Sequence, residues 1–487
     1  MTYNQEQHNN YKNRATSGLL WTFLERFGAQ CVTLIVSIIL ARLLDPVVFG
    51  TVAIVTVFME ILNVFIDSGL GNALIQKKDA DDIDFSSVFY FNIFMCIALY
   101  LVLFFLAPLM SRFYGMAELT DIIRVMGLSL IVSGVRNIQR AFVSRKLQFK
   151  RFFFATIGGT LGAAALGIWM AYRGFGVWAL VAQGLFNNVV GTVILWLTVK
   201  WRPKRVFSFT RFRGLFSFGW KLLVSDLINT VYNNLRQLII GKMYTTQSLA
   251  MYNRGYMIPN VFVININSAI DSVLFPVMSS AQDDVNVVRA MTRRSIRISS
   301  YIMWPVMMGI AACSTPLVSI LLTDKWLPCV PFLIIFCISY AFLPLQTANL
   351  NAIKALGRSE IYLKLEIIKK IVGFAILAAT MWFGPLVMAA SNLLFAVINY
   401  LINAFPNRKL LNYSYGQQIM DAAPPMLLSA FMFGIVYCVR FLELSNWLTL
   451  IIQIPLGVLI YVGGSRLFKF ESFTYLFSTV KELIKNN

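Results

Sequence analysis

Apolar residues recur along this chain in long runs, which short polar pieces with Pro, Gly and charged residues separate. A membrane-spanning helix needs about 20 mainly apolar residues, and in lipid only a helix or a closed barrel satisfies the backbone. The runs therefore predict an all-α polytopic membrane protein of about fourteen transmembrane helices. Their predicted ranges are 18–42, 47–76, 85–111, 119–140, 152–172, 175–199, 214–241, 247–279, 298–322, 329–353, 367–383, 386–406, 420–440 and 445–466.

The composition excludes a soluble protein. Of 487 residues, 58% are hydrophobic and 13% charged, and the mean hydropathy is +0.69. Residues 1–17 are polar and lack the apolar core of a signal peptide, so we expect the first span to direct insertion. The net charge of +20 is spread over many short loops, which indicates membrane topology rather than nucleic-acid binding. Six cysteines without a CxxC pair and a single histidine, His8, indicate neither a metal site nor a disulfide framework.

The distribution of basic residues tests the number of helices. With the N-terminus in the cytoplasm, 31 of the 42 Lys and Arg residues fall in cytoplasmic segments and 6 on the opposite side. Adding or removing one helix would invert every later loop and destroy this bias. An even number of helices with both termini in the cytoplasm follows, and twelve satisfies the test as well as fourteen.

The sequence contains an internal repeat with an offset of about 200 residues. Residues 41–43 (ARL) resemble 241–243 (GKM), and DSGLGNAL from Asp67 resembles DSVLFPVM from Asp271. Six spans return the chain to its starting side, so the two lobes have the same orientation, with a pseudo-two-fold axis along the membrane normal. The predicted parts are an N-terminal tail (1–17), an N-lobe (18–199), a basic linker (200–213), a C-lobe (214–410), and two further helices with a C-terminal tail (411–487).

Charged residues inside the predicted spans are the candidate functional residues. A charge at mid-bilayer costs about 2.5–3.5 kcal/mol on insertion scales, so these residues must face one another or a watery cavity. Most lie on the first two helices of each lobe, which we expect to line an opening between the lobes. The ten residues are Glu25, Arg26, Glu60, Asp67, Arg124, Arg136, Asp226, Arg236, Arg254 and Asp271.

Two interpretations of these charges stay open. They form acid–arginine pairs that tie helices together, or the arginines line an anion-binding cavity. All five deep bases are arginine, whose planar fork binds phosphate bidentately, and this favours the cavity. At the end of the second helix, we expect Asp67 to face Arg26, and Gly69 and Gly71 to allow close helix contact or bending.

Several blocks resemble a known family. They are ARLLDPVVFGTVA (41–53), DSGLGNALIQKK (67–78), GFGVWALVAQ (174–183), IGKMYTTQSLAMYNRGYMIPN (240–260), VLFPVMSSAQDD (273–284) and LLTDKWLPCVPFL (321–333). Together they resemble the polysaccharide-exporting branch of the MOP superfamily, which comprises the Wzx-type repeat-unit flippases and their PST relatives. The resemblance extends over about residues 15–400.

The resemblance implies a flippase with a MATE-like fold in the bacterial inner membrane. Its substrate would be an undecaprenyl-diphosphate-linked repeat unit of O-antigen, capsule or exopolysaccharide, moved to the outer leaflet by alternating access. The family's arginines on helices 1 and 8 correspond to Arg26 and Arg254. The polysaccharide polymerase and the chain-length machinery are candidate partners, and the expected state is a monomer because the cavity lies between lobes of one chain.

The sequence has no ATP site, so transport would be driven by an H⁺ or Na⁺ gradient or by polymerisation of the product. Candidate substrate-binding residues are Arg26, Arg236, Arg254, Arg124 and Arg136, and candidate ion-coupling or charge-pair residues are Glu25, Glu60, Asp67, Asp226 and Asp271. A MATE-type ion-coupled drug or metabolite antiporter and a peptidoglycan-precursor flippase are the alternatives. A membrane enzyme such as a glycan polymerase is disfavoured because the outward loops are short, and we expect no catalysis and no cofactor.

Overall fold

The computed structural model describes residues 21, 28–67, 69–77, 79–146 and 148–485. Over these residues the protein is helical, without a strand. The chain divides into two compact units, Met1–Ala250 and Met251–Asn487, so the division falls in the first turns of one long helix (α9).

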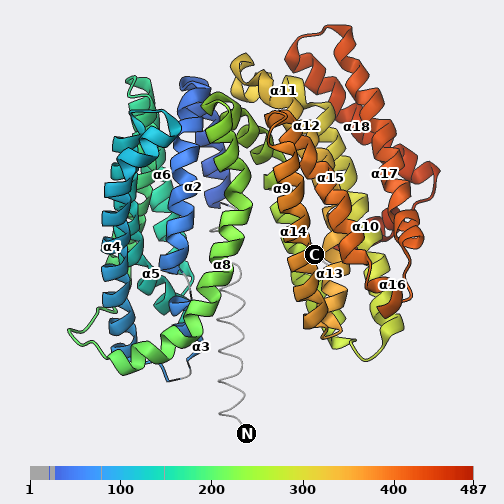
Figure 1. Cartoon of the computed structure of the whole chain (residues 1–487). Coiled ribbons are helices and arrows are strands. Elements are labelled where there is room, and N and C mark those ends of the chain that lie inside the picture. Colours follow the sequence, from blue (N-terminus) through green and yellow to red (C-terminus); the bar gives the residue numbers. More distant parts are fainter. Residues whose placement is uncertain (1–20, 22–27, 68, 78, 147, 486–487) are drawn as a thin grey trace. The chain divides into compact units, whose positions relative to one another are not determined.

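Each unit is a bundle of long helices (Figure 1). The first unit contains an apolar helix over Gly28–Leu43, followed by α2 (Pro46–Asp67), α3 (Leu70–Gln76), α4 (Asp82–Tyr114), α5 (Leu119–Arg145), α6 (Lys150–Tyr172), α7 (Val177–Thr198) and α8 (Phe209–Met243). Nearly all of α9 (Thr246–Ser280) belongs to the second unit, which continues with α10 (Val285–Ala312), α11 (Ser314–Leu322), η1 (Asp324–Cys329), α12 (Val330–Ala341), α13 (Leu343–Ala355), α14 (Ser359–Thr380), α15 (Pro385–Ala404), α16 (Asn407–Leu410), α17 (Tyr415–Cys438), η2 (Val439–Leu442), α18 (Asn446–Leu467) and α19 (Glu471–Lys485).

Every predicted helix has a helical counterpart, but three predicted as continuous are broken. The predicted helix over 47–76 is α2 and α3, separated at Gly69, whose φ of +63° is left-handed. The predicted helix over 298–322 bends by 67° between α10 and α11. The third, over 329–353, is divided into α12 and α13.

Proline explains two of these breaks. The ring of a proline clashes with the carbonyl four residues earlier and removes a helical N–H. Pro316 thus opposes continuity at Ala312, where α10 ends, and Pro344 opposes it at Tyr340, next to the end of α12.

The described helices differ in how apolar they are. Eight described helical segments are long and apolar enough to cross a membrane, and one of them, Asp324–Ala355, combines η1, α12 and α13. The number is nine when the bent pair of α10 and α11 is taken as one span. The other long helices are less apolar, because α5, α8 and α14 contain more charged residues and α9 contains many Asn and Ser residues. Fourteen spans therefore stays a prediction, while the multi-pass character of the protein is clear.

Close helix packing in the first unit depends on small residues. Gly158 and Gly162 on α6 face α7. A Cβ on Gly158 would lie 2.7 Å from the Ile194 side chain, and a Cβ on Gly162 would lie 2.8 Å from the Phe186 ring. Gly159 approaches the α7 backbone, because its Cβ would lie 3.0 Å from the Asn187 carbonyl oxygen. Small-residue packing of this kind is typical of membrane helices.

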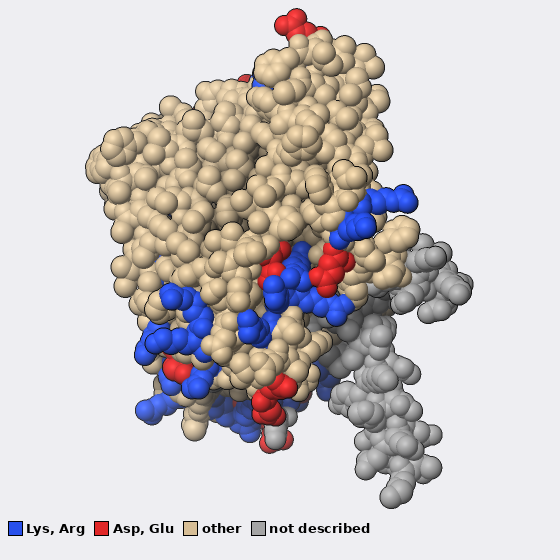
Figure 2. Space-filling view, turned by 90° about the vertical axis from the view of Figure 1, so that its right-hand side faces the viewer, with Lys and Arg blue, Asp and Glu red and all other residues tan. Residues whose placement is uncertain are grey.

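Basic side chains gather at one end of the molecular face shown in Figure 2, where Lys and Arg concentrate in the lower part. Above them the same face is almost free of charge. An uncharged band beside a basic rim is the pattern expected of a surface in lipid.

Candidate functional site: a polar cavity in the first unit

A polar cavity of about 510 Å³ lies among α2, α5, α7 and α8 of the first unit. Its lining is unusual for a membrane bundle because eight of its side chains are charged or amide. They are Glu60 and Asn63 on α2, Arg136, Asn137 and Arg140 on α5, Asn188 on α7, and Asp226 and Asn229 on α8. Polar groups at membrane depth are tolerated where they line a water-filled space.

Helical spacing brings the two arginines of the cavity together. Arg136 and Arg140 are four residues apart on α5, so they lie on the same face one turn apart. Between them, the Asn137 amide donates to the Ile66 carbonyl oxygen (2.5 Å). Because Ile66 is in the last turn of α2, this bond satisfies a carbonyl that the helix itself leaves unpaired.

Amide groups also hold the acidic side of the cavity. The Asn234 amide donates to Glu60 Oε2 (2.9 Å), and the Gln237 amide donates to Asn234 Oδ1 (3.1 Å). Glu60 and Asp226 are both exposed to this volume. Two carboxylates thus face the same space as two guanidinium groups.

A second cavity of about 490 Å³ lies among α5, α6 and α7. It shares Arg136, Arg140 and Asn188 with the first, so the two arginines border both volumes. Its other lining includes Asn187, Thr156 and the rings of Phe149 and Phe152. Gly191 lies beside the Arg136 guanidinium, since a Cβ there would make an ordinary contact with Nη1 (3.6 Å).

The chemistry of these linings suits an anionic, hydroxyl-rich molecule. Guanidinium groups bind phosphate oxygens through charge-assisted hydrogen bonds, and amide side chains both donate to and accept from hydroxyl groups. Among the described residues, no group of three or more His, Cys, Asp or Glu could hold a metal ion.

Three of the predicted site residues meet in the cavity: Glu60, Arg136 and Asp226. The cavity is also lined by two helices that were not expected to line an opening, α5 with Arg136 and α7 with Asn188. Glu25 and Arg26 lie outside the described residues, and so does the side chain of Asp67, although α2 reaches that residue.

The other predicted arginines of the first unit lie elsewhere. Arg124, twelve residues before Arg136 on α5, stacks its guanidinium over the Phe104 ring (4.1 Å to the centroid). Arg236 is half-buried on α8, nearly two turns beyond Asn229, and lines neither cavity. Of the predicted arginines that the structure describes in the first unit, Arg136 alone lines this cavity.

In the second unit the predicted residues have local partners. Arg254 is only 6% exposed, with its guanidinium over the Trp326 ring (5.1 Å to the centroid) and near Met257 Sδ (3.5 Å). Asp271 is exposed on α9, and its Oδ1 accepts from the Asn351 amide (2.6 Å).

Residues missed by the sequence reasoning complete the cavity. The predicted helix ends at residue 140, so Arg140 lies at its boundary and is not among the ten candidate charges, whereas α5 continues to Arg145. Its position four residues after Arg136 could have revealed it. The asparagines carry no charge and were not considered, although amides within apolar runs are themselves a polar signal.

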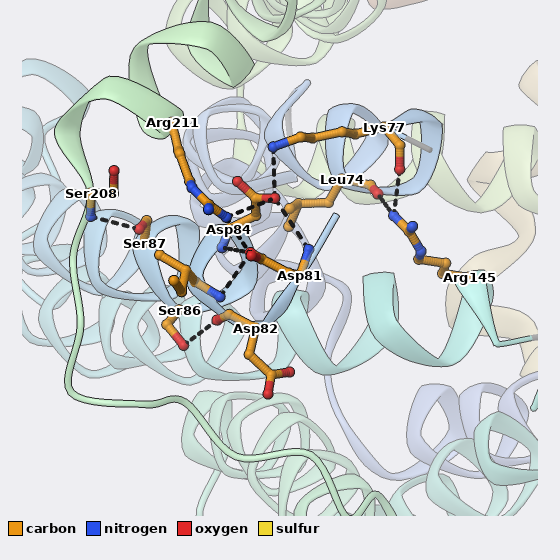
Figure 3. Close-up of polar contacts among 11 residues, drawn as sticks. Leu74, Lys77, Asp81, Asp82, Asp84, Ser86, Ser87, Arg145, Ser208 and Arg211 are labelled. Carbon is orange, nitrogen blue, oxygen red and sulfur yellow. Dashed lines mark hydrogen bonds and ion pairs between the residues drawn. The ribbon is translucent and has the colours of Figure 1, made fainter. Parts of the chain in front are cut away.

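A second charged cluster in the first unit lies where α4 begins (Figure 3). Asp81 and Asp84 form a capping box, in which Asp81 accepts from the Ile83 and Asp84 amides and Asp84 Oδ2 accepts from the Asp81 amide (3.2 Å). Lys77 pairs with the fully buried Asp84 (2.7 Å), and Arg211 of α8 pairs with Asp81 (2.5 Å). We call this cluster of Lys77, Asp81, Asp84 and Arg211 the α4 junction.

Neighbouring bonds fix the segments around the α4 junction. Arg145 donates to the carbonyl oxygens of Leu74 (2.6 Å) and Lys77 (2.7 Å) at the end of α3. Ser87 Oγ accepts from the Ser208 amide (2.9 Å), which holds the segment before α8. The Arg211 guanidinium lowers the pKa of Asp81 to about 2.

The fold belongs to a known class of membrane transporter. A structure titled "Lipid II flippase MurJ, inward closed conformation" matches with a TM-score of 0.76 at 14% identity, over 92% of this chain and 98% of that one. An inward-facing multidrug resistance MATE family transporter of the MOP superfamily matches with a TM-score of 0.61 at 16% identity, over 79% of this chain and 96% of that one. The protein thus has the fold of the MOP superfamily, as the sequence predicted.

The family follows from the sequence. Residues 39–331 match the model of the family described as "Polysaccharide biosynthesis protein", and the chain belongs to that family. It is similar to the teichuronic acid biosynthesis protein TuaB of Bacillus subtilis, with 23% identity over 92% of this chain and 94% of TuaB. The lipopolysaccharide biosynthesis protein WzxC of Escherichia coli is 22% identical over 86% of each chain. The succinoglycan biosynthesis transport protein ExoT of Rhizobium meliloti is 25% identical over 71% of this chain and 70% of ExoT.

Proposed function

We propose that this protein moves undecaprenyl-diphosphate-linked polysaccharide repeat units from the inner to the outer leaflet of the bacterial inner membrane. Membership of the polysaccharide biosynthesis family supports the substrate class. So do relatives that serve teichuronic acid, lipopolysaccharide and succinoglycan biosynthesis. The position of the binding site rests on one observation, the pair Arg136 and Arg140 facing a polar volume inside a membrane unit.

The physical task explains such a cavity. A diphosphate with a hydrated glycan cannot enter hydrocarbon, because unpaired charge and unsatisfied hydroxyl groups are costly there. In our proposal, Arg136 and Arg140 bind the diphosphate, and the amides of Asn63, Asn188 and Asn229 bind sugar hydroxyls. The lipid tail stays in the bilayer while the polar head crosses by alternating access.

The acids of the cavity are candidates for coupling. Glu60 and Asp226 share the volume with the arginines, so a proton or Na⁺ bound there would change the net charge that a diphosphate meets. Such a change would link substrate release to an ion gradient. The other named acids, Glu25, Asp67 and Asp271, stay coupling or charge-pair candidates.

Arg124, which stacks on Phe104, is not among the substrate contacts of this proposal, and Arg236 and Arg254 form a second set of them. Arg236→Ala and Arg254→Ala are expected to lower export without lowering the amount of protein. Arg254→Lys should rescue export only in part, because an ammonium group lacks the planar fork that stacks on Trp326. Arg26 belongs to the same set.

The wider proposal concerns topology and partners. Both termini lie in the cytoplasm, the protein has no catalytic activity of its own, and it acts as a monomer beside the polysaccharide polymerase and chain-length machinery.

The predicted lobes, 18–199 and 214–410, describe the sequence repeat. By packing, α8 belongs to the first unit, where it contacts α2, α3 and α4.

The test is export by single variants in a host from which the chromosomal gene has been deleted. Arg136→Ala and Arg140→Ala should each reduce surface polysaccharide about tenfold, the effect of losing about 1.4 kcal/mol of binding. Lipid-linked repeat units should accumulate inside the cell. Arg124→Ala is the matched control on α5, because its side chain stacks on Phe104 outside the cavity.

Protein level is measured in the same membranes by immunoblot, so that loss of export is separated from loss of protein. Normal export by both the Arg136 and Arg140 variants would refute the proposed site. If the deletion strain exports normally and instead becomes sensitive to cationic drugs, the protein is an antiporter and the substrate assignment is wrong.

A further inference from the structure

A third cavity, in the second unit, contains none of the residues proposed to bind substrate or a coupling ion. It has a volume of about 390 Å³ between α10 and α19. Its lining contains three arginines of α10, at positions 293, 294 and 297, and three residues of α19, Glu471, Ser472 and Tyr475. Three guanidinium groups on one helix wall are a strong concentration of positive charge.

A buried acid fixes two of the three arginines. Asp421 of α17 is 6% exposed, and it accepts from Arg293 Nε (2.6 Å) and Nη2 (3.1 Å) and from Arg297 Nε (2.8 Å). The Tyr413 hydroxyl donates to the same carboxylate (2.8 Å). These bonds hold both guanidinium groups at the cavity wall in one orientation.

The third arginine is not held by an acid. Arg294 is exposed, and its guanidinium lies over the Tyr475 ring of α19 (4.0 Å to the centroid). No carboxylate among the described residues lies within ion-pair distance of Arg294. Glu471 pairs instead with Arg297 (2.6 Å). Three guanidinium groups thus meet only two described carboxylates, so the cavity carries a net positive charge.

The sequence of α19 places this cavity at a membrane boundary. The helix begins four residues after α18, one of the helices apolar enough to span a membrane. Apolar residues at 473, 476, 477, 480, 483 and 484 follow helical spacing, with Ser, Thr, Lys and Glu between them. Phe477 is 62% exposed. A helix of this kind lies in the interface between headgroups and acyl chains.

We propose that this cavity binds the phosphate headgroup of an anionic membrane lipid, with Arg294 as the principal contact. Basic pockets beside spanning helices are suited to anionic headgroups, and the open edge of the Arg294 fork can donate two hydrogen bonds to one phosphate. The bound lipid would fix α19 against α10, because Arg294 on one helix and Ser472 and Tyr475 on the other would contact the same headgroup.

Native mass spectrometry of the purified full-length chain in detergent tests this inference. Phosphatidylglycerol and phosphatidylcholine are added at equal concentration, and the bound fraction of each is measured. The wild type should retain phosphatidylglycerol preferentially. Arg294→Gln should weaken this binding about tenfold, and Arg294→Lys should weaken it less, because it keeps the charge but loses the fork.

Arg289→Gln is the matched control, since Arg289 is on the same helix but contacts Gln417 and does not line the cavity. All variants are also made in an Arg136→Ala chain, so that anions bound in the first unit cannot imitate the effect. Equal phosphatidylglycerol binding by wild type and Arg294→Gln would overturn the inference. Displacement of the lipid by inorganic phosphate at the same concentration would overturn its assignment to a lipid.

Discussion

The polar cavity and the α4 junction contain the same kinds of side chain and differ in what those side chains face. At the junction, Lys77 pairs with Asp84 and Arg211 pairs with Asp81, and the buried Asp84 also completes a helix cap. In the cavity, Arg136 shares an open volume of about 510 Å³ with carboxylates and amides. The first arrangement uses charge to join segments, whereas in the second the charged groups border an open polar volume.

This difference bears on the two interpretations of the buried charges. An acid and an arginine in adjacent membrane helices are equally compatible with a structural pair and with a binding site. The two arrangements differ in the space between the charged groups: at the junction the side chains are in direct contact, and in the cavity they surround an open volume. Substitutions at the junction should therefore affect stability, and substitutions in the cavity should affect transport.

The largest loss of stability is expected for Gly69→Ala, next to the α4 junction. A Cβ at Gly69 would lie 2.2 Å from the carbonyl oxygen and 2.4 Å from the Cα of Gly219 on α8, and the φ of +63° is itself unfavourable for alanine. The backbones must separate, at a cost of about 3 kcal/mol or more. Thermal unfolding of the purified chain in detergent measures this loss.

The neighbouring Gly71 provides the control for that prediction. A Cβ there would lie 3.7 Å from Asn137 Oδ1, an ordinary contact, and alanine favours a helix interior. Gly71→Ala should leave the melting temperature unchanged or raise it. If the two substitutions lower it equally, the close approach of α3 and α8 is not what Gly69 provides.

The second-largest loss of stability is expected for Asp84→Ala, at the α4 junction itself. The substitution removes the partner of Lys77 and the acceptor for the Asp81 amide. Because the cation is 37% exposed and can be resolvated in part, we expect a loss of about 2–3 kcal/mol rather than the full cost of breaking a buried pair. Asp79→Ala, at an exposed position in the preceding turn, is the control for the same unfolding measurement.

The fold was predictable because lipid forces each apolar run into a helix, and the runs could be located from hydropathy alone. The breaks were not predictable, because a proline within a span has two outcomes. Pro316 and Pro344 follow helix ends, whereas Pro108 lies within the continuous α4. Which outcome occurs depends on whether neighbouring groups satisfy the freed carbonyl, and this is a tertiary property.

The site was predictable in part for a similar reason. Buried charge is conspicuous in an apolar sequence, and this singled out Glu60, Arg136 and Asp226 before any of them could be placed together. Sequence spacing cannot show which helices are neighbours, so the contribution of α5 and α7 to one cavity was missed. Neutral asparagines such as Asn188 do not stand out by charge.

A smaller effect, on transport alone, is expected when the cavity acids are neutralised. Glu60→Gln and Asp226→Asn keep the shape of the lining but can no longer exchange a proton or bind Na⁺ by charge. In membrane vesicles, the stimulation of flipping by an imposed proton or sodium gradient should fall about tenfold, an effect of about 1.4 kcal/mol. The melting temperature should barely change.

Glu118→Gln is the control for that experiment, since Glu118 is exposed at the opposite end of α5. It should respond to the gradient as the wild type does. If transport by the wild type is already independent of both gradients, the proposed coupling role of the cavity acids is wrong, while the arginine site is unaffected.

The smallest effect concerns the pH dependence of the junction. Arg211 lowers the pKa of Asp81 to about 2, below its ordinary value of 3.8, so the folded protein favours the ionised carboxyl. The stabilisation from this group is therefore fully present above about pH 4 and is lost as the pH falls through 2. Because the pair is exposed to solvent, the contribution is small.

The melting temperature of the wild type minus that of Asp81→Asn should be constant from neutral pH to about 4 and should vanish near pH 2. If the difference vanishes already near neutral pH, the ion pair with Arg211 does not stabilise the junction, and the capping bonds of Asp84 alone hold the start of α4.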